Sequence, residues 1–159
     1  MTFRVGDQIA HPMHGAGTID SIVSRRMNGV NREYYELRLP AGDMRVMIPV
    51  DSLEEIGVRP IISGEAAEQI WQMLPLLEIE MTSNWNQRYR ENMLRIKSGS
   101  LHEVAKVVKG LFLRDRQRSL STGERKMLHN AKQIFLSELV LAQNISFQDG
   151  ERRLNQILK

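Results

Sequence analysis

The chain has 159 residues, of which 42% are hydrophobic and 26% are charged, and its net charge is +3. This composition is typical of a folded globular protein, and the length allows one domain or two small ones. The sequence has no cysteine and no apolar run near the ~20 residues that span a bilayer, so we expect a cytoplasmic protein without disulfides, thiolate metal sites or membrane contact.

The charge is distributed unevenly along the chain. Residues 1–62 hold seven arginines and eight acidic residues, a net charge of −1, whereas residues 84–132 hold twelve basic and four acidic residues, a net charge of +8. A basic segment of this kind indicates an anionic partner, and nucleic acid is the first candidate. Solvated helix faces would give the same count, so charge alone leaves both explanations open.

Short alternating segments separated by turns fill the first sixty residues. Segments 17–23, 34–39 and 44–48 have the pattern of strands. Between the first two, Asn28-Gly29 predicts a type I′ hairpin turn, because both residues accept a positive φ. Several short strands joined by turns predict a small, strongly bent sheet or barrel.

Alternation also predicts which side chains face the core. On the third strand, Val46 and Ile48 should point inward, and Arg45 and Met47 outward. The strand before it should bury the face made of Tyr35, Leu37 and Leu39.

Nothing in the sequence indicates catalysis. His11 and His14 could form a metal pair, but the absence of cysteine and of a nearby acidic cluster argues against zinc. The Gly15–Gly17 turn is too short for a phosphate loop, and no nucleophile has a base at recognisable spacing. We therefore expect no enzyme activity, metal, cofactor or small-molecule substrate.

The composition changes at residues 57–60, which we interpret as a linker between a β domain, 1–60, and a helical domain, 61–159. Capping residues and apolar spacing predict five helices in the second part. The first follows Ser63 and ends near Leu74, with Ala66, Ile70 and Leu74 buried and Trp71 packed beside them. Three others start after Asn84, Ser98–Ser100 and Ser121, and the last covers Phe147–Leu158.

Trp85 has two interpretations. It begins the helix capped by Asn84, and Tyr89, Met93 and Ile96 follow at helical spacing, so it could top a buried stripe. It could equally be an exposed aromatic beside cations, which is one way in which proteins hold distorted nucleic acid. We expect Arg88 and Arg90, on the other sides of this helix, to be in solvent.

A second group of cations begins the helix after Ser121. Ser121 and Glu124 have the spacing of a capping box. Arg125 and Lys126 follow in the first turn, where the helix dipole disfavours positive charge. Helix stability does not explain them, whereas a docked phosphate would.

In this order and spacing, the motifs resemble those of the CarD family of bacterial transcription regulators. Phe3–Asp7, His14–Gly17 and Ile48–Val50 resemble its N-terminal module, which also occurs in transcription-repair coupling factor. The helical half of the family is matched by Asn84-Trp85, Arg88-Tyr89, Leu113–Asp115, Leu120–Leu128 and Glu138–Ala142.

The resemblance implies an α+β protein with a Tudor-like β domain that binds the β-subunit lobe of RNA polymerase, partly through a strand edge. It also implies a helical domain that contacts promoter DNA, without sequence specificity, at the upstream fork of the melted bubble. A tryptophan matching Trp85 acts there as a minor-groove wedge, residues matching Arg90 and Arg125 contact the backbone, and the open complex is stabilised. Arg25 matches a polymerase-contacting arginine. A second such arginine is replaced by Met47, for which Arg45 could compensate.

From these observations we expect a monomer with two interfaces. The expected DNA-binding residues are Trp85, Arg88, Arg90, Arg125, Lys126 and Lys132, and the expected polymerase-binding residues are Arg25, Arg45, Met47, Ile48 and Pro49. The alternative is a protein–protein adaptor whose basic helices bind an acidic protein surface.

Overall fold

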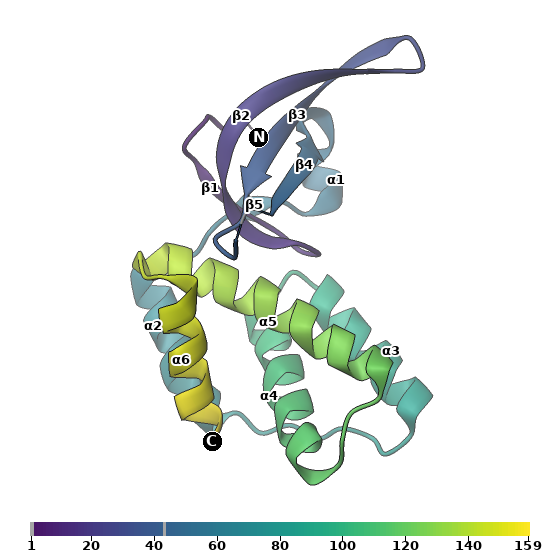
Figure 1. Ribbon diagram of the computed structural model, residues 1–159, viewed down its shortest axis with the longest axis vertical. Helices are drawn as coiled ribbons and strands as arrows, with labels where there is room; N and C mark the ends of the chain where they lie inside the picture. The colour runs from purple at the N-terminus through teal and green to yellow at the C-terminus, as the bar shows by residue number, and fades with distance from the viewer. Residues whose placement is uncertain (1, 43) are drawn as a thin grey trace.

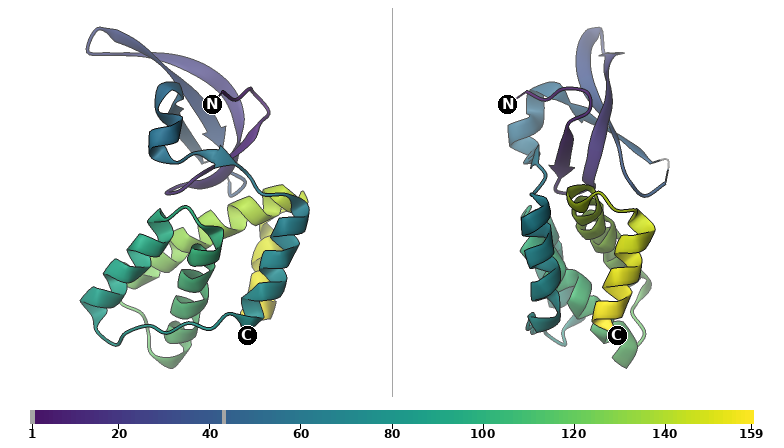
Figure 2. Two further views of the ribbon diagram at one scale, coloured as in Figure 1. Left: turned by 180° about the vertical axis from the view of Figure 1, so that it is seen from behind. Right: turned by 90° about the vertical axis from the view of Figure 1, so that its left-hand side faces the viewer.

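The chain folds into an antiparallel sheet followed by a group of helices. The computed structural model describes residues 2–42 and 44–159. The sheet lies at one end of the long axis and the helices lie at the other (Figures 1 and 2). This architecture confirms the predicted α+β class, with a bent N-terminal sheet and five C-terminal helices.

Five strands form one sheet in the order β4-β3-β2-β1-β5, and each pairing is antiparallel. The register of β2 against β3 shifts between Ile19 and Ser21. An irregularity of this kind bends a strand and increases its twist. The strands are β1 Gln8–His11, β2 Gly15–Met27, β3 Val30–Arg38, β4 Arg45–Pro49 and β5 Arg59–Pro60.

The β2–β3 hairpin contains the predicted tight turn. The φ angles are +53° at Asn28 and +79° at Gly29, the two positive values that a type I′ turn requires. The hairpin extends away from the helices (Figure 1). Met27 and Val30 flank the turn and are 63% and 65% exposed. The turn prediction is confirmed, and the tip of the hairpin presents apolar side chains to solvent.

The inner face of the sheet forms its own core. Tyr35 and Ile48 are buried, as alternation predicts, whereas Arg45 is exposed. The Tyr35 hydroxyl accepts a hydrogen bond from the Phe3 N–H at 3.0 Å and donates one to the Phe3 carbonyl at 3.1 Å. This pair of bonds fastens the N-terminal segment to the sheet. The core consists of Phe3, Ile9, Ile19, Tyr35, Leu37, Leu39, Ile48, Leu53 and Val58.

Residues 57–60 do not form the open linker that the sequence predicts, because they close α1 and form the last strand of the sheet. Gly57 has a φ of +93° and ends the short helix α1, Leu53–Ile56. Val58 is buried, and Arg59–Pro60 forms β5 against Ile9 and Ala10 of β1. A local change of composition cannot reveal this pairing, because the partner strand lies about fifty residues earlier. The division of the chain at 60/61 stays a prediction.

Each of the five C-terminal helices begins at a capping side chain. The capping oxygens accept hydrogen bonds from the N–H groups three residues later, which satisfies donors that a helix start leaves free. The predicted starts are confirmed. The capping residues are Ser63, Asn84, Ser100, Ser121 and Ser146, and the helices are α2 Gly64–Met73, α3 Trp85–Lys97, α4 Leu101–Gln117, α5 Thr122–Gln143 and α6 Phe147–Leu158.

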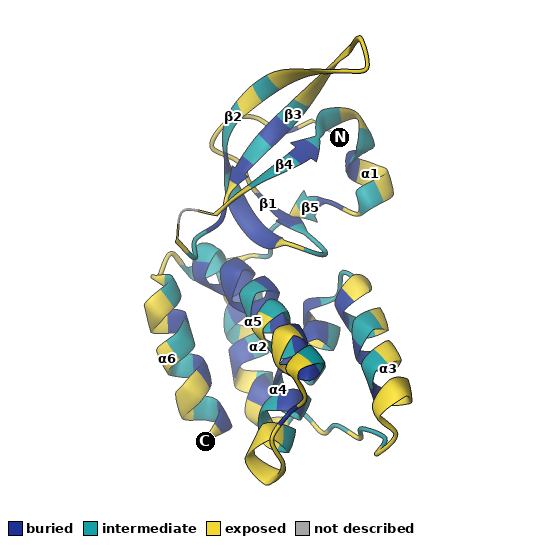
Figure 3. Cartoon of the chain, turned by 45° about the vertical axis from the view of Figure 1, so that its right-hand side comes forward, coloured by how far each residue is buried: buried dark blue, intermediate teal, exposed yellow. Residues whose placement is uncertain are grey.

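The helices surround a second core to which α4 and α5 contribute most (Figure 3). Trp71 of α2 is 1% exposed and packs edge-on against Phe135 of α5, which confirms its role in packing. Of the buried face expected for the first helix, Leu74 is confirmed, and Ile70 is half-buried against the core. Ala66 is only half-buried, because α2 is turned to place Ala67 and Trp71 inside. Within the described residues, no helix is both long and apolar enough to cross a membrane.

α5 joins the helices to the sheet at the start of β2. The N–H of Ala16 donates to Ser137 Oγ at 2.8 Å, and that hydroxyl donates to the Ile134 carbonyl at 3.0 Å. A Cβ atom on Gly15 would lie only 2.5 Å from Ser137 Oγ. Glycine is therefore needed here for the strand to approach α5.

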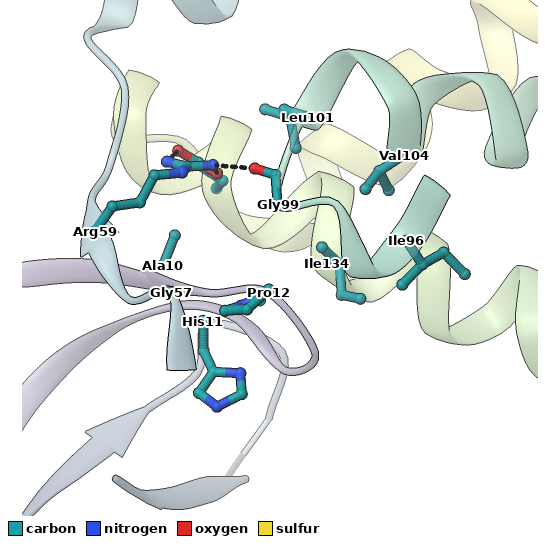
Figure 4. A pocket seen from close by; sticks show the side chains of 12 residues that line it. Ala10, His11, Pro12, Gly57, Arg59, Ile96, Gly99, Leu101, Val104 and Ile134 are labelled. Atoms are coloured by element: carbon teal, nitrogen blue, oxygen red, sulfur yellow. Dashed lines mark hydrogen bonds and ion pairs between the residues drawn. The ribbon is translucent and has the colours of Figure 1, made fainter. Parts of the chain in front are cut away.

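An ion pair makes a second connection between the halves. Glu138 of α5 is 2% exposed and accepts from Arg59 at 2.6 and 2.8 Å and from the Ile62 N–H at 3.0 Å. The hydrogen bonds that Arg59 donates to Glu138 raise the pKa of Arg59. Beside this pair, between the sheet and the helices, lies a cavity of about 20 Å³ (Figure 4). It has room for about one water molecule, so it is no ligand site.

Candidate nucleic-acid and protein interfaces

Trp85 is the first residue of α3 and lies at the surface. Asn84 caps the helix, its side chain accepting from the Gln87 N–H at 3.0 Å. No earlier helical turn covers the first residue, and Trp85 is 42% exposed. The core-packing interpretation of Trp85 is therefore wrong. The residues buried from this helix are Arg88, Asn92 and Ile96.

Three contacts hold the Trp85 indole. It stacks on Tyr89 with ring centroids 5.1 Å apart and an interplanar angle of 20°. Its Nε1–H donates to Ser121 Oγ at 3.0 Å. Gly123 lies beneath both rings, because a Cβ built there would be 3.6 Å from Trp85 and 3.9 Å from Tyr89. The first turns of α3 and α5 thus meet at this tryptophan.

Arg88 contradicts the expectation that it lies in solvent, because it is 2% exposed. Its guanidinium donates to both Glu124 carboxylate oxygens at 2.7 and 2.9 Å, and these bonds raise its pKa. Helical spacing alone placed it on the polar side of α3, but a carboxylate on α5 allows this side to be buried. Arg88 therefore cannot contact DNA directly, and we remove it from the candidate surface.

The capping box at the start of α5 is half confirmed. Ser121 Oγ accepts from the Glu124 N–H at 3.2 Å, as predicted. The Glu124 side chain does not return to the Ser121 N–H but pairs with Arg88. Ser121 thus accepts two hydrogen bonds, one from its own helix and one from Trp85, which matches the two lone pairs of a hydroxyl.

Basic side chains lie in the first two turns of α3 and α5, near Trp85, and one more lies farther along α5. Arg90, Arg125 and Lys126 are exposed, and Lys132 is half-buried. Within residues 2–42 and 44–159, no hydrogen bond or ion pair occupies these four side chains. Arg125 and Lys132 are seven residues apart and share one face of α5. We call Trp85, Arg90, Arg125, Lys126 and Lys132 the cationic end.

Other basic residues of the +8 segment serve the fold. Lys109 donates to the carbonyls of Leu74, Pro75 and Leu77 at 2.7 to 3.0 Å, and burial lowers its pKa. Arg116 donates to the last helical carbonyl of α6, at Leu158, at 3.1 Å. Together with Arg88, these residues show that a charge count overstates the cations available to a ligand.

A second candidate surface lies on the outer face of the sheet. Arg25, Arg26, Met27, Tyr34 and Met47 line a shallow hollow formed by β2, β3 and β4. The outward position of Met47 on β4 is confirmed by this placement. The hollow combines two cations with apolar side chains, a composition that is common at protein–protein interfaces.

The remaining predicted residues of this surface lie on β4. Arg45 is already engaged, because it pairs with Asp20 and lies 3.6 Å from Glu36. The Ile48 side chain is buried, so only its backbone can face a partner. Among the strands of residues 2–42 and 44–159, β4 is at the edge of the sheet and pairs only with β3. Its outer edge is therefore available for strand addition, except at Pro49, which has no N–H.

His11 and His14 pack against each other, and His11 also accepts a hydrogen bond from the backbone of its own loop. Their ring centroids are 4.4 Å apart, and His11 Nδ1 accepts from the Met13 N–H at 3.0 Å. Burial, with a smaller contribution from His14, lowers the pKa of His11 to about 4. In the described part of the chain, no three His, Asp or Glu side chains gather as a metal site would require.

Sequence reasoning missed Glu124, Ser121 and Tyr89 as supports of Trp85. Tyr89 could have been found, because residues four apart on a helix are neighbours. The spacing of Ser121 and Glu124 predicted a capping box, which would engage the Glu124 side chain within its own helix. Its pairing with Arg88 spans 36 residues, and no local pattern encodes a contact at that separation.

Comparison with known proteins identifies both halves of the chain. Residues 3–62 match the family described as the CarD-like/TRCF RID domain, and residues 69–155 match the CarD C-terminal domain. The chain is also 34% identical over 144 residues to the Bacillus subtilis protein YdeB, whose name describes it as a candidate transcription factor. That alignment covers 91% of this chain and 94% of YdeB.

Proposed function

Because this chain belongs to the CarD family, we propose that it is a transcription regulator that stabilises the open promoter complex. Its β domain would bind the β-subunit lobe of RNA polymerase, and Trp85 would enter the minor groove at the upstream fork of the bubble. The observation that carries this proposal is an exposed tryptophan at a helix N-terminus, with Arg90 beside it and with Arg125 and Lys126 near the start of α5, none of which has a partner among the described residues.

The energetics favour a fork over intact duplex. Separating a stacked base step costs a few kcal/mol, but at a fork the step is already disrupted, and stacking of an aromatic side chain on a base contributes about 1–3 kcal/mol. Arg90 and Arg125 would contact phosphates, which supply affinity and orientation without sequence information. The protein should therefore act at many promoters.

The outer face of the sheet supports the polymerase contact. Arg25 and Met47 line one hollow together with Tyr34, and the adjacent β4 edge could pair with a strand of the β lobe. Methionine in place of a second arginine makes this surface more apolar. Arg45 is held by Asp20 and Glu36, so Arg25 and its neighbour Arg26 would supply the positive charge of the hollow.

Footprinting of a promoter with and without RNA polymerase tests the proposal and separates it from an adaptor that binds an acidic protein. We expect protection at the upstream fork only when polymerase is present, because the isolated cationic end should bind DNA weakly. An adaptor would leave the fork unprotected in both cases.

The polymerase contact is tested by a pull-down with the isolated β lobe. We expect Arg25→Glu to abolish binding, because it places a negative charge beside Arg26 and cancels the net positive charge of the hollow without disturbing a core residue. Arg4→Glu is the matched control, since Arg4 is also exposed on the β domain. Equal binding by both variants, or no binding by the wild-type chain, would contradict the proposal.

A further inference from the structure

We propose that the buried Arg88–Glu124 ion pair is a positioning device that holds the Trp85 indole in one orientation. This inference rests on the proposed function, because it assigns the pair a role in presenting the wedge. The pair itself touches no nucleic acid. It lies one turn below Trp85 between α3 and α5, and both side chains are at most 3% exposed.

The ion pair and the Trp85 contact connect the same two helix starts. Arg88 follows Trp85 by three residues, and Glu124 follows Ser121 by three residues. Trp85 Nε1 meets Ser121 Oγ at 3.0 Å, and the Arg88 guanidinium meets both Glu124 oxygens at 2.7 and 2.9 Å. Because both contacts depend on one spacing between α3 and α5, the buried pair fixes the distance that the tryptophan contact needs.

Arg88 also fixes the segment that leads into α3. Its Nη1 donates to the Thr82 carbonyl at 3.0 Å and to the Ser83 carbonyl at 3.2 Å. These residues immediately precede the cap Asn84, so the guanidinium fixes the backbone segment that leads into Trp85. A lysine could supply the charge but not this planar set of donors.

Stability alone does not account for the pair. Desolvating two charges opposes their attraction, and apolar residues of similar volume often replace such pairs with equal or greater stability. A fixed orientation does account for it. A tryptophan at the first position of a helix is not confined by a preceding turn, and a side chain that must be immobilised on binding loses affinity. A group held in advance avoids that loss.

The experiment uses Arg88→Met/Glu124→Met, which removes both charges and retains the volume. The matched control is Arg95→Met/Glu103→Met, which removes the ion pair between α3 and α4 at the far end of α3. Fluorine-19 NMR of the chain labelled with fluorotryptophan reports Trp85 separately from Trp71, and loss of one signal in Trp85→Phe assigns them.

We expect the Met pair to keep the thermal midpoint of the wild-type chain or raise it. The Trp85 fluorine signal should broaden or move to the position of a free indole. The lifetime of the open complex should fall about two- to tenfold, the range expected when one side chain must be ordered on binding. The control pair should change neither the signal nor the lifetime.

Arg88→Lys keeps the test decisive if the Met pair fails to fold. It retains the charge opposite Glu124 but loses the planar fork, so the Trp85 signal should broaden in a folded chain. A native Trp85 signal with a native lifetime in either folded variant would overturn the inference. The proposed function has a separate test, because it is contradicted if Trp85→Ala leaves the lifetime of the open complex unchanged. In that case the Trp85 fluorine signal of the Arg88 and Glu124 variants still tests whether the ion pair positions the indole.

Discussion

At the scale of single residues, the tryptophan and its supports are the central feature. Trp85 is exposed although its helix has an apolar spacing that suits a core residue. The reason is long-range, because α3 turns Arg88 and Asn92 inward. A charged residue can take a core position only when a partner on another helix satisfies it, and Glu124 does so here.

Ser121→Ala should reduce both stability and function. It removes the cap of α5, which should cost about 1 kcal/mol of folding free energy, and it removes the acceptor for Trp85 Nε1. Ser146→Ala is the matched control, because Ser146 caps α6 in the same way but lies outside the cationic end. Thermal unfolding should show similar destabilisation for the two variants. The open-complex lifetime should be shorter only for Ser121→Ala.

Equal lifetimes for these two variants would show that the Trp85–Ser121 contact has no role in the open complex. This conclusion would hold even if the two variants differed in thermal stability, because the prediction depends on the difference between their open-complex lifetimes.

At the scale of elements, one carboxylate connects α2, α5 and α6. Glu68 accepts two bonds from Arg153 at 2.6 and 2.9 Å, one from Gln72 at 2.8 Å and one from Gln143 at 3.0 Å. These bonds, that of Arg153 foremost, lower the pKa of Glu68 to about 2. Arg153 Cζ also lies over the Trp71 ring, 4.8 Å from its centroid, so this polar network contacts the helical core through Trp71.

The stability contributed by Glu68 should depend on pH. Its pKa is about 2 in the folded chain and about 4.5 in the unfolded chain. The contribution should therefore be complete above pH 4.5 and be lost as the pH falls toward 2. Glu68→Gln should flatten the pH dependence of the unfolding free energy in this window. Glu65→Gln, an exposed position on the same helix, should leave it steep, and two identical profiles would contradict the network.

Local signals predicted most elements of the fold. Ser63, Asn84 and Ser121 were recognised as caps, and Asn28-Gly29 as a hairpin turn, because these preferences depend on a few neighbouring residues. The strand at Arg59–Pro60 was missed because its existence depends on β1. The burial of Arg88 was missed for the same reason, since it depends on how α5 packs against α3. For Trp85 the sequence left a buried and an exposed interpretation open, and only the packing of the two helices decides between them.

At the scale of the whole molecule, α5 connects the two interfaces. Its first turns carry part of the cationic end, and Ser137 and Glu138 near its other end bind the sheet. A rigid helix between these sites would fix the direction in which a polymerase-bound sheet presents Trp85.

Gly15→Ala should loosen this connection. The new Cβ would lie 2.5 Å from Ser137 Oγ at a φ of +94°. Gly6→Ala is the control, because its φ is +96° but no atom lies within 4 Å. Both variants carry the backbone strain, so the difference measures the contact with α5. We expect Gly15→Ala to lose about 1–3 kcal/mol more in chemical denaturation, and equal losses would show that the contact adjusts without cost.

The lifetime of open complexes after a competitor challenge, measured for Trp85→Ala, tests the central claim most directly. Leu94→Ala provides the control, because Leu94 is a 69% exposed apolar residue on the same helix. Loss of one aromatic–base stack, about 1–3 kcal/mol, should shorten the lifetime about fivefold or more while the chain stays folded. Leu94→Ala should match the wild-type chain. An unchanged lifetime for a folded Trp85→Ala chain would contradict the account.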